Sequence, residues 1–199
     1  MKFLILLNGP PSCGKDALAN VFKKKHSTIN PDVTICKFAN SLLDTVFATF
    51  PDINLDNYDQ RKNLPIGGIF GNEITLRQWM IKYAEEFMKP IFGKSIFGRI
   101  TCQKITELLK TNYVVFVTDL GKDEELKTIA DNFSDKSNLQ IIIVRISRPG
   151  TSFENDSRNY VYEDKVLGNN VGNIKSIDLV NDSNLDILEN ELMRCFLSV

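Results

Sequence analysis

The sequence predicts an α/β protein in which a parallel sheet carries helices on both of its faces. Strand-like and helix-like segments alternate along nearly the whole chain, which is typical of such a sheet. The first strand-like segment leads through a glycine-rich turn into a helical pattern. The chain has 199 residues, of which 43% are hydrophobic and 25% charged, and this composition fits a single globular domain over residues 1–199.

The glycine-rich turn has the form of a phosphate-binding loop. It reads Gly-Pro-Pro-Ser-Cys-Gly-Lys over residues 9–15, the pattern G-x-x-x-x-G-K. Gly9 and Gly14 let the backbone bend around an anion, and Lys15 supplies a positive charge for the outer phosphates. The helix expected over 15–25 turns its N-terminal N–H groups and positive dipole end toward the same anion. The alternative is a strand-to-helix turn that binds nothing.

Asp16 departs from the usual motif, in which Ser or Thr offers a hydroxyl to Mg²⁺ at this position. A carboxylate is also a hard oxygen ligand, suited to holding the ion directly or through water. An acidic residue in the first turn of a helix is favourable through the helix dipole as well. The sequence therefore leaves two roles for Asp16, one in metal and phosphoryl chemistry and one in stabilising the helix.

Apolar periodicity and turn residues predict the remaining elements. Strands are expected at residues 3–8, 33–38, 114–117, 140–146 and 177–180, and further helices at 41–49, from 75, after 93, over 124–133 and from 181. An irregular stretch is expected over 50–73, because it carries Pro51, Pro65, Gly67, Gly68 and Gly71. A stretch of this length is either a mobile segment that covers a substrate or a surface insertion.

The helix expected from residue 75 begins with a capping box, Thr75-Leu76-Arg77-Gln78. A stripe that faces the core follows at helical spacing and consists of Leu76, Trp79, Met80, Tyr83 and Phe87. Arg77, Glu86 and Lys89 fall off this stripe and are candidates to point into a cleft.

Charged residues follow the later strands, at the edge where parallel sheets bind ligands. Asp119 comes just past the strand at 114–117, where a carboxylate holds a metal-bound water or orients a nucleophile, or else caps the helix at 124–133. Arg145, Arg148 and Arg158 surround an irregular segment after the fourth strand. Guanidinium groups there suit a lid that clamps phosphate oxygens, although exposed arginine is also an ordinary surface residue.

Net charge and cysteine usage limit the classes of partner. A formal net charge of −1 gives no electrostatic basis for non-specific binding to duplex nucleic acid or to an anionic membrane, so small ligands are the expected partners. The four cysteines form no C-x-x-C pair, which suits reduced thiols in the cytoplasm. The apolar run after Met1 is too short for a signal peptide, and no stretch approaches the length of a membrane span. A homodimer is left open.

Several segments resemble the deoxynucleoside monophosphate kinases of bacteriophages and related viruses. They are the loop at 9–16 ending in G-K-D, FANSLLD at 38–44, TLRQWMIKYAEEFMKPIFGKSIFGR at 75–99, VTDLGKDEE at 117–125 and LVNDSNLDIL at 179–188. The resemblance spans nearly the whole chain, and G-K-D is its most specific element. It implies a P-loop kinase fold, a three-layer sandwich with a five-stranded parallel sheet, a monophosphate-binding helical segment at about 40–110 and a lid at about 147–168.

The resemblance also implies a reaction and a set of residues. The γ-phosphoryl of ATP would pass, with Mg²⁺, to a deoxynucleoside 5′-monophosphate, in the host cytoplasm if the protein is viral. Catalysis would rest on Lys15, Asp16, Asp119 and Arg148, and the metal on Asp16 and Asp119. ATP would be bound by Gly9, Ser12, Cys13, Gly14, Lys15, Asp16, Ala17 and Asn181. The acceptor would be bound by Phe38, Arg77, Glu86 and Arg99.

Two other interpretations stay open. The G-K-D loop, the helix around residues 83–86 and the F-x-R at 97–99 also resemble animal phosphomevalonate kinases. A P-loop protein that binds ATP as a switch, without kinase activity, is the alternative of another class. Lys89, Ala84 and Leu43 depart from the phage family's usual Arg, Gly and Lys, so the sequence does not fix which acceptor is used.

Overall fold

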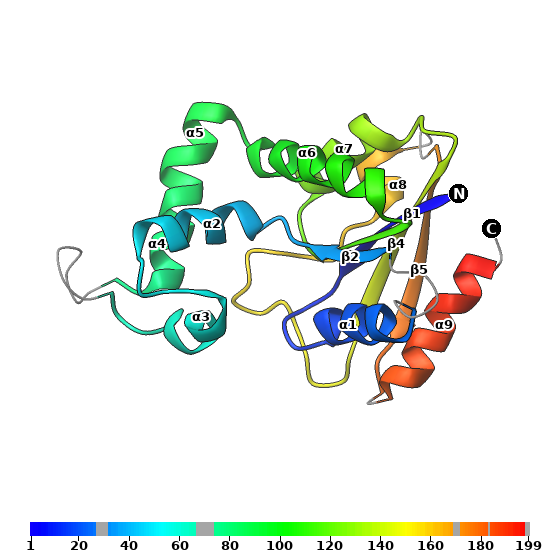
Figure 1. Ribbon diagram of the computed structural model, residues 1–199, viewed down its shortest axis with the longest axis horizontal. Coiled ribbons are helices and arrows are strands. Elements are labelled where there is room, and N and C mark those ends of the chain that lie inside the picture. Colours follow the sequence, from blue (N-terminus) through cyan, green and yellow to red (C-terminus); the bar gives the residue numbers. More distant parts are fainter. Residues whose placement is uncertain (27–31, 67–73, 169–171, 183, 198–199) are drawn as a thin grey trace. The chain divides into compact units, whose positions relative to one another are not determined.

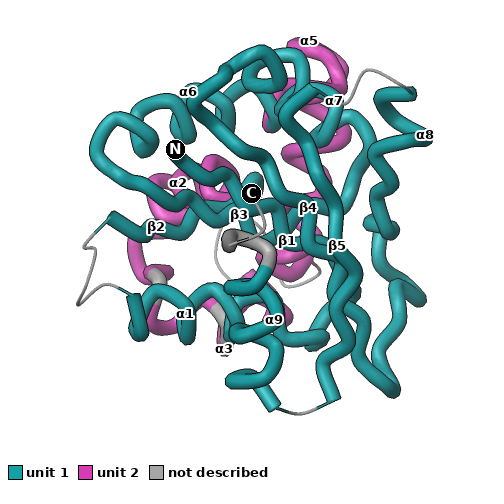
Figure 2. Tube along the Cα trace, turned by 90° about the vertical axis from the view of Figure 1, so that its right-hand side faces the viewer, with its two compact units in different colours: residues 1–38, 98–199 teal, residues 39–97 magenta. Residues whose placement is uncertain are grey.

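The computed structural model of this chain describes residues 1–26, 32–66, 74–168, 172–182 and 184–197. The chain divides into two compact units, one of residues 1–38 with 98–199 and the other of residues 39–97 (Figure 2). Within the described ranges, no helix is both long enough and apolar enough to cross a lipid bilayer.

Five parallel strands form the sheet of the first unit, in the order β2-β3-β1-β4-β5 (Figure 1). The strands are β1 (Lys2–Asn8), β2 (Val33–Cys36), β3 (Val114–Leu120), β4 (Leu139–Ser147) and β5 (Ile174–Val180). Because β1 pairs with both β3 and β4, the loop after β1 leaves from the middle of the sheet's carboxyl edge. The expected parallel sheet is confirmed.

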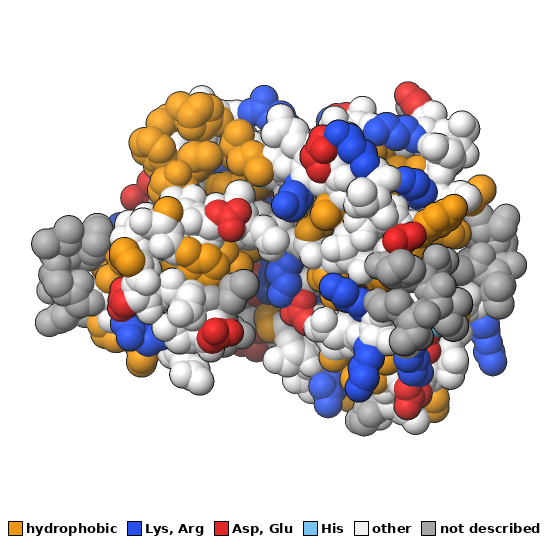
Figure 3. Space-filling view, viewed as in Figure 1, with side chains coloured by type: hydrophobic (Ala, Val, Ile, Leu, Met, Phe, Trp, Pro, Cys, Tyr) orange, Lys and Arg blue, Asp and Glu red, His pale blue; other side chains and the backbone are white. Residues whose placement is uncertain are grey.

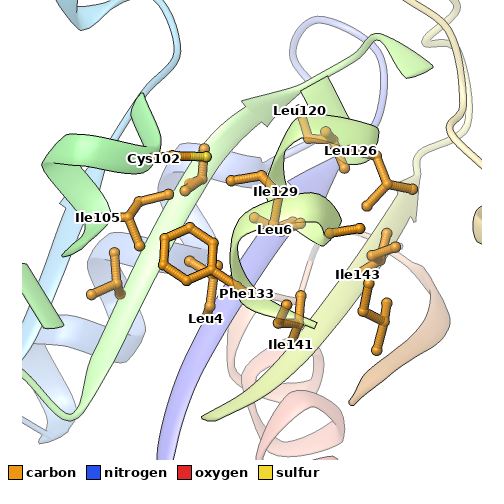
Figure 4. Close-up of a cluster of buried hydrophobic side chains, with 14 of the residues drawn as sticks. Leu4, Leu6, Cys102, Ile105, Leu120, Leu126, Ile129, Phe133, Ile141 and Ile143 are labelled. Carbon is orange, nitrogen blue, oxygen red and sulfur yellow. The ribbon is translucent and has the colours of Figure 1, made fainter. Parts of the chain in front are cut away.

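Helices cover both faces of this sheet (Figure 1). The helices of this unit are α1 (Lys15–His26), α6 (Ile96–Thr111, whose first two residues belong to the other unit), α7 (Asp123–Phe133), α8 (Glu163–Leu167) and α9 (Leu185–Leu197). Alternate residues of each strand enter opposite clusters, since side chains along a strand alternate between faces. Leu4 and Leu6 pack with residues of α6 and α7 (Figure 4), whereas Ile5 and Leu7 pack with residues of α1 and α9.

The second unit is helical and has its own small core. Its helices are α2 (Asn40–Thr49), α3 (Leu55–Arg61), α4 (Leu76–Lys82), the π-helix η2 (Tyr83–Met88) and α5 (Lys89–Phe92). The core contains Val46, Phe50, Ile53, Leu76 and Met80. The predicted capping box is confirmed, because Gln78 N–H donates to Thr75 Oγ1 at 3.2 Å and Thr75 N–H donates to Gln78 Oε1 at 2.8 Å.

Two sequence expectations about this unit are wrong in part. The stretch 50–73 is not wholly irregular, because α3 lies within it; its residues 67–73, including Gly67, Gly68 and Gly71, lie outside the described residues. Phe87 does not end a buried stripe but is 50% exposed. The π-helical turn that starts at Tyr83 explains this, because it shifts the following residues off α-helical spacing. Phe87 is one of the exposed large apolar residues of this unit, with Ile81, Ile91 and Phe92. Hydrophobic side chains gather over α5 on the face that Figure 3 shows.

Candidate phosphate-binding site

The carboxyl edge of the sheet brings together polar residues from all five strands. Asp16 lies in the first turn of the helix after β1, and Lys37 directly follows β2. Thr118 and Asp119 lie near the carboxyl end of β3, and Arg148 and Asn181 directly follow β4 and β5. Ligands of open parallel sheets bind at this edge, so the position itself marks a candidate site.

The loop between β1 and α1 needs its two glycines. At Gly9 a β-carbon would lie 2.3 Å from the backbone oxygen of Ile146, and at Gly14 it would lie 2.4 Å from Asn181 Nδ2. Gly14 also has a positive φ of 106°, and Ser12 has a φ of 63°. Positive φ values of this kind turn successive backbone N–H groups toward one side and form an anion-binding concavity.

Asn181 and Arg148 hold this loop from two other strands. Asn181 Nδ2 donates to the carbonyl of Cys13 at 2.8 Å, while its own N–H donates to Ser147 O at 2.8 Å. Arg148 Nη1 donates to the carbonyl of Ser12 at 3.2 Å. The ends of β4 and β5 therefore fix the shape of the loop. Ala17 follows in the first turn of α1.

Lys15 is buried within the loop that it closes. Its ammonium donates to the carbonyls of Gly9 and Pro10, both at 2.7 Å. Burial lowers the pKa of Lys15, and the positive charge of Arg158 lowers it further, while Cys13 partly offsets both. A cation held at the N-terminus of α1 reinforces the positive potential of the helix end.

Asp16 is held by two neighbours that the sequence analysis did not single out. Its Oδ1 accepts a hydrogen bond from Thr118 Oγ1 at 2.6 Å and lies 2.9 Å from Lys37 Nζ. Burial opposes ionisation of Asp16, but the hydrogen bond from Thr118 and the ion pair with Lys37 outweigh it and lower the pKa of this carboxyl. Asp16 is therefore an ionised carboxylate with a fixed orientation.

Strand alternation explains why Thr118 and Lys37 meet at Asp16. Cys36 pairs with Val117, so the next residues along these parallel strands, Lys37 and Thr118, lie side by side. They continue the alternation of the residues that pack against α1, namely Val33 and Ile35 on β2 and Val114 and Phe116 on β3. Their side chains accordingly point to the face on which α1 begins.

Asp119 lies where the register between β1 and β3 shifts, since Val117 and Leu120 both pack in the cluster with α6 and α7. It lies within the strand rather than just past it, and its Oδ1 accepts the backbone N–H of Phe38 at 2.7 Å. The first N–H groups around α7 are instead accepted by Glu125, whose Oε2 binds Gly121 N at 3.0 Å and Lys122 N at 3.1 Å. Glu125, and not Asp119, therefore caps the N-terminus of α7.

Glu125 gives the folded protein a pH-dependent stability. Burial, and next the negative charge of Asp119, raise the pKa of Glu125 from 4.5 to about 7. Between these values the folded state binds more protons than the unfolded state, so this contribution to the free energy of unfolding is full below pH 4.5 and is lost by about pH 7. Glu125→Gln mimics the protonated side chain, and its stability relative to wild type should rise steadily across this window.

Urea unfolding of both proteins at several pH values measures this difference. The exposed Glu154→Gln serves as the matched control, and its difference from wild type should stay flat. A flat difference for Glu125→Gln as well would contradict the raised pKa of Glu125.

Asn8 fastens the segment after β4 to the sheet. It is fully buried, its Nδ2 donates to Leu120 O at 2.8 Å and to Asn159 O at 3.0 Å, and its Oδ1 accepts the N–H of Val161 at 3.0 Å. The same segment carries Arg158, whose side chain binds both oxygens of Asp156 at 2.9 and 2.7 Å. The Arg158 side chain packs over Gly121, where an added β-carbon would lie 2.5 Å from the arginine Cγ.

Arg145 does not act from an irregular segment, as its grouping with Arg148 and Arg158 suggested. It lies on β4, is buried, and pairs with Asp178 at 2.6 Å and with Glu163 at 2.8 Å. A buried guanidinium needs such partners, and here they tie β4 to β5 and α8. Arg145 is therefore a structural residue.

The expected acceptor-binding residues fall in both units. Phe38 is buried in the core cluster of the first unit, and its backbone N–H contacts Asp119; Arg99 is exposed on α6. Arg77 and Glu86 belong to the second unit and are exposed there, with Glu86 lying 3.7 Å from Lys82. The predicted separation of Arg77 from the apolar stripe is confirmed.

Comparisons of sequence find no matching protein family and no matching curated protein. Solved structures similar to this chain include the APS kinase of Mycobacterium tuberculosis, with 12% identity, a TM-score of 0.46, and coverage of 97% of this chain and 95% of that one. The thymidylate kinase of Ehrlichia chaffeensis has 14% identity and a TM-score of 0.47, with coverage of 98% of this chain and 100% of that one. The shikimate kinase of Bacteroides thetaiotaomicron has 11% identity and a TM-score of 0.42, with coverage of 99% of each chain. Likenesses this weak carry no argument about activity.

The chain has an α/β fold, with five strands in the order β2-β3-β1-β4-β5 and a loop after β1 in which Ser12, Gly9 and Gly14 have positive φ. The central sheet with helices on both faces is the three-layer arrangement that the sequence predicts.

Proposed function

We propose that this chain is an ATP-dependent phosphotransferase that converts deoxynucleoside 5′-monophosphates to diphosphates. The observation that carries the proposal is the loop at 9–15, with Lys15 inside it and an oriented carboxylate, Asp16, in the next position. A loop of this shape binds the phosphates of a nucleotide through backbone N–H groups. The resemblance of residues 38–44 and 75–99 to viral deoxynucleoside monophosphate kinases supports the acceptor class.

The residues at this edge fit Mg²⁺ bound mainly by the nucleotide. Among the described residues, no group of three or more His, Cys, Asp or Glu forms a ready-made metal site. One ionised carboxylate suits this ion, because Mg²⁺ usually keeps several waters and takes one or two carboxylates beside substrate phosphates. Asp16 would supply that carboxylate, and Asp119 would contact a metal-bound water. The ion would neutralise charge that develops on the transferred group.

The chain's own residues then act by position and charge. Lys15 binds the outer phosphate oxygens from inside the loop, and Arg148 approaches the same loop from the end of β4. Cations placed where negative charge develops stabilise the transition state of an in-line transfer. The acceptor phosphate is already anionic near neutral pH, so the reaction needs no strong general base.

An acceptor panel tests this function. ADP formation from ATP and Mg²⁺ is followed with each deoxynucleoside monophosphate and with phosphomevalonate. We expect turnover with at least one deoxynucleoside monophosphate and none with phosphomevalonate. Turnover with phosphomevalonate alone would replace the acceptor class. ATP binding without any turnover would favour the switch protein.

Arg77 tests the assignment of the acceptor side. A guanidinium binds a phosphate through two parallel hydrogen bonds, so Arg77→Lys keeps the charge but loses planar recognition. We expect the KM for the acceptor to rise about tenfold or more, roughly 1.4 kcal/mol, with the KM for ATP little changed. Steady-state titrations of each substrate measure both constants. A change confined to the KM for ATP would place Arg77 on the donor side instead.

A further inference from the structure

We propose that Lys37 is a phosphate-site residue that acts through Asp16, and that the two side chains together set the affinity of the loop for the phosphates of a nucleotide. The proposal rests on nucleotide binding as part of the proposed function. It does not depend on which acceptor is used.

Asp16 creates the need for such a residue. It stands at the N-terminal end of α1, directly after Lys15, where the usual motif has a neutral hydroxyl. A carboxylate at this position repels the phosphates that the loop binds, although water screens part of this repulsion because the Asp16 side chain is 57% exposed. A positive charge at the same point offsets this repulsion when no divalent ion is bound.

Lys37 supplies that charge from a neighbouring strand. Its Nζ lies 2.9 Å from Asp16 Oδ1, the same oxygen that accepts the Thr118 hydroxyl at 2.6 Å. Thr118 is buried and fixes the carboxylate, whereas the Lys37 side chain is 36% exposed. Lysine carries its charge on a flexible stem with three donors. This ammonium is thus able to stay with Asp16 or to turn toward phosphate oxygens beside it.

The pair gives Lys37 two effects on a nucleotide. Without a divalent ion, Lys37 neutralises Asp16 and removes its repulsion of the phosphates. When Mg²⁺ is bound to the nucleotide, the ion also offsets the negative charge of Asp16. The affinity for ATP should then depend less on Lys37. Lys37 is a positioning residue in this scheme, since it acts through the orientation and charge of Asp16.

A double-mutant cycle on binding tests the proposal. Dissociation constants for ATP are measured by calorimetry, in EDTA and in excess Mg²⁺, for wild type, Lys37→Met, Asp16→Asn and the double variant. In EDTA, Lys37→Met should weaken ATP binding about tenfold in the wild-type background and by about twofold or less in the Asp16→Asn background. In excess Mg²⁺, Lys37→Met should weaken ATP binding by less than this tenfold factor. Lys37→Arg, which keeps the charge, should retain most of the affinity.

The control is Lys24→Met, which removes an exposed lysine at the far end of α1 and should leave both constants unchanged. An equal loss from Lys37→Met in both backgrounds would show that Lys37 acts independently of Asp16 and would overturn the proposal. A change in thermal stability without a change in affinity would reduce the pair to a structural contact and also overturn it.

The outcome separates this proposal from the proposed function. If ATP binds with the expected coupling but no acceptor is phosphorylated, Lys37 keeps its role and the phosphotransferase fails. If wild type binds no ATP in either condition, both proposals are overturned.

Discussion

Replacing Lys15 with alanine should strongly reduce phosphoryl transfer while leaving the fold in place. The ammonium lies inside the loop, 2.7 Å from the carbonyls of Gly9 and Pro10, at the N-terminus of α1. A charge-assisted contact to the transferring phosphates is worth about 2 to 4 kcal/mol of transition-state stabilisation, so turnover should fall by a factor of about 30 to 1,000. The measurement is ADP formation at saturating ATP and acceptor.

Lys24→Ala is the control for this substitution, because it removes an exposed lysine from the same helix. Urea unfolding should show that Lys15→Ala changes the free energy of unfolding by no more than about 2 kcal/mol. Near-full turnover of Lys15→Ala at saturating ATP would mean that this loop is not the catalytic site.

Replacing Asn8 with leucine should destabilise the protein by about 3 kcal/mol or more, although the two side chains are similar in size. Asn8 is fully buried and satisfies the carbonyls of Leu120 and Asn159 and the N–H of Val161. Leucine leaves these three backbone groups without their partner, and each unsatisfied buried group costs about 1–3 kcal/mol. The free energy of unfolding in urea measures the loss.

Asn132→Leu is the matched control, since Asn132 is exposed on α7 and should cost less than about 1 kcal/mol. The segment 159–161 should also become accessible to hydrogen exchange in Asn8→Leu. Equal stabilities for the two variants would show that Asn8 does not fasten this segment.

The phosphate loop was predictable from the sequence because its physics is local. The spacing of Gly9, Gly14 and Lys15 lies within one turn between a strand and a helix, and the structure shows why both glycines are required. The alternation of elements likewise predicts a parallel sheet, because few other arrangements bury such a pattern. The capping box at 75–78 is another local signal that the structure confirms.

The partners of the loop were not predictable, because they depend on strand order. Lys37 and Thr118 lie far apart in the sequence and meet only because β2 pairs with β3 in one register. Period-two alternation carries the signal for both residues, but it becomes readable only once the neighbouring strands are known. The sequence indicates only that Asn8 ends a strand. Its hydrogen bonds to Asn159 and Val161 depend on long-range structure and could not be predicted.

The role of Arg145 required the same long-range information. In the sequence it stands beside Arg148 and resembles one of a group of arginines after a strand. In the structure it faces Asp178 on β5 and Glu163 on α8, and these pairings decide that it is structural. The exposure of Phe87 had no sequence signal, because a π-helical turn changes the periodicity within a helix that otherwise looks regular.

Transfer of label from [γ-³²P]ATP tests the central claim most directly. Wild type and Lys15→Ala are incubated with labelled ATP, Mg²⁺ and each deoxynucleoside monophosphate, and the products are separated by charge. We expect label to enter a deoxynucleoside diphosphate with wild type, and to do so at least about 30-fold more slowly with Lys15→Ala, as the proposed function predicts. Label that stays in ATP with every acceptor, or appears only as inorganic phosphate, would contradict it.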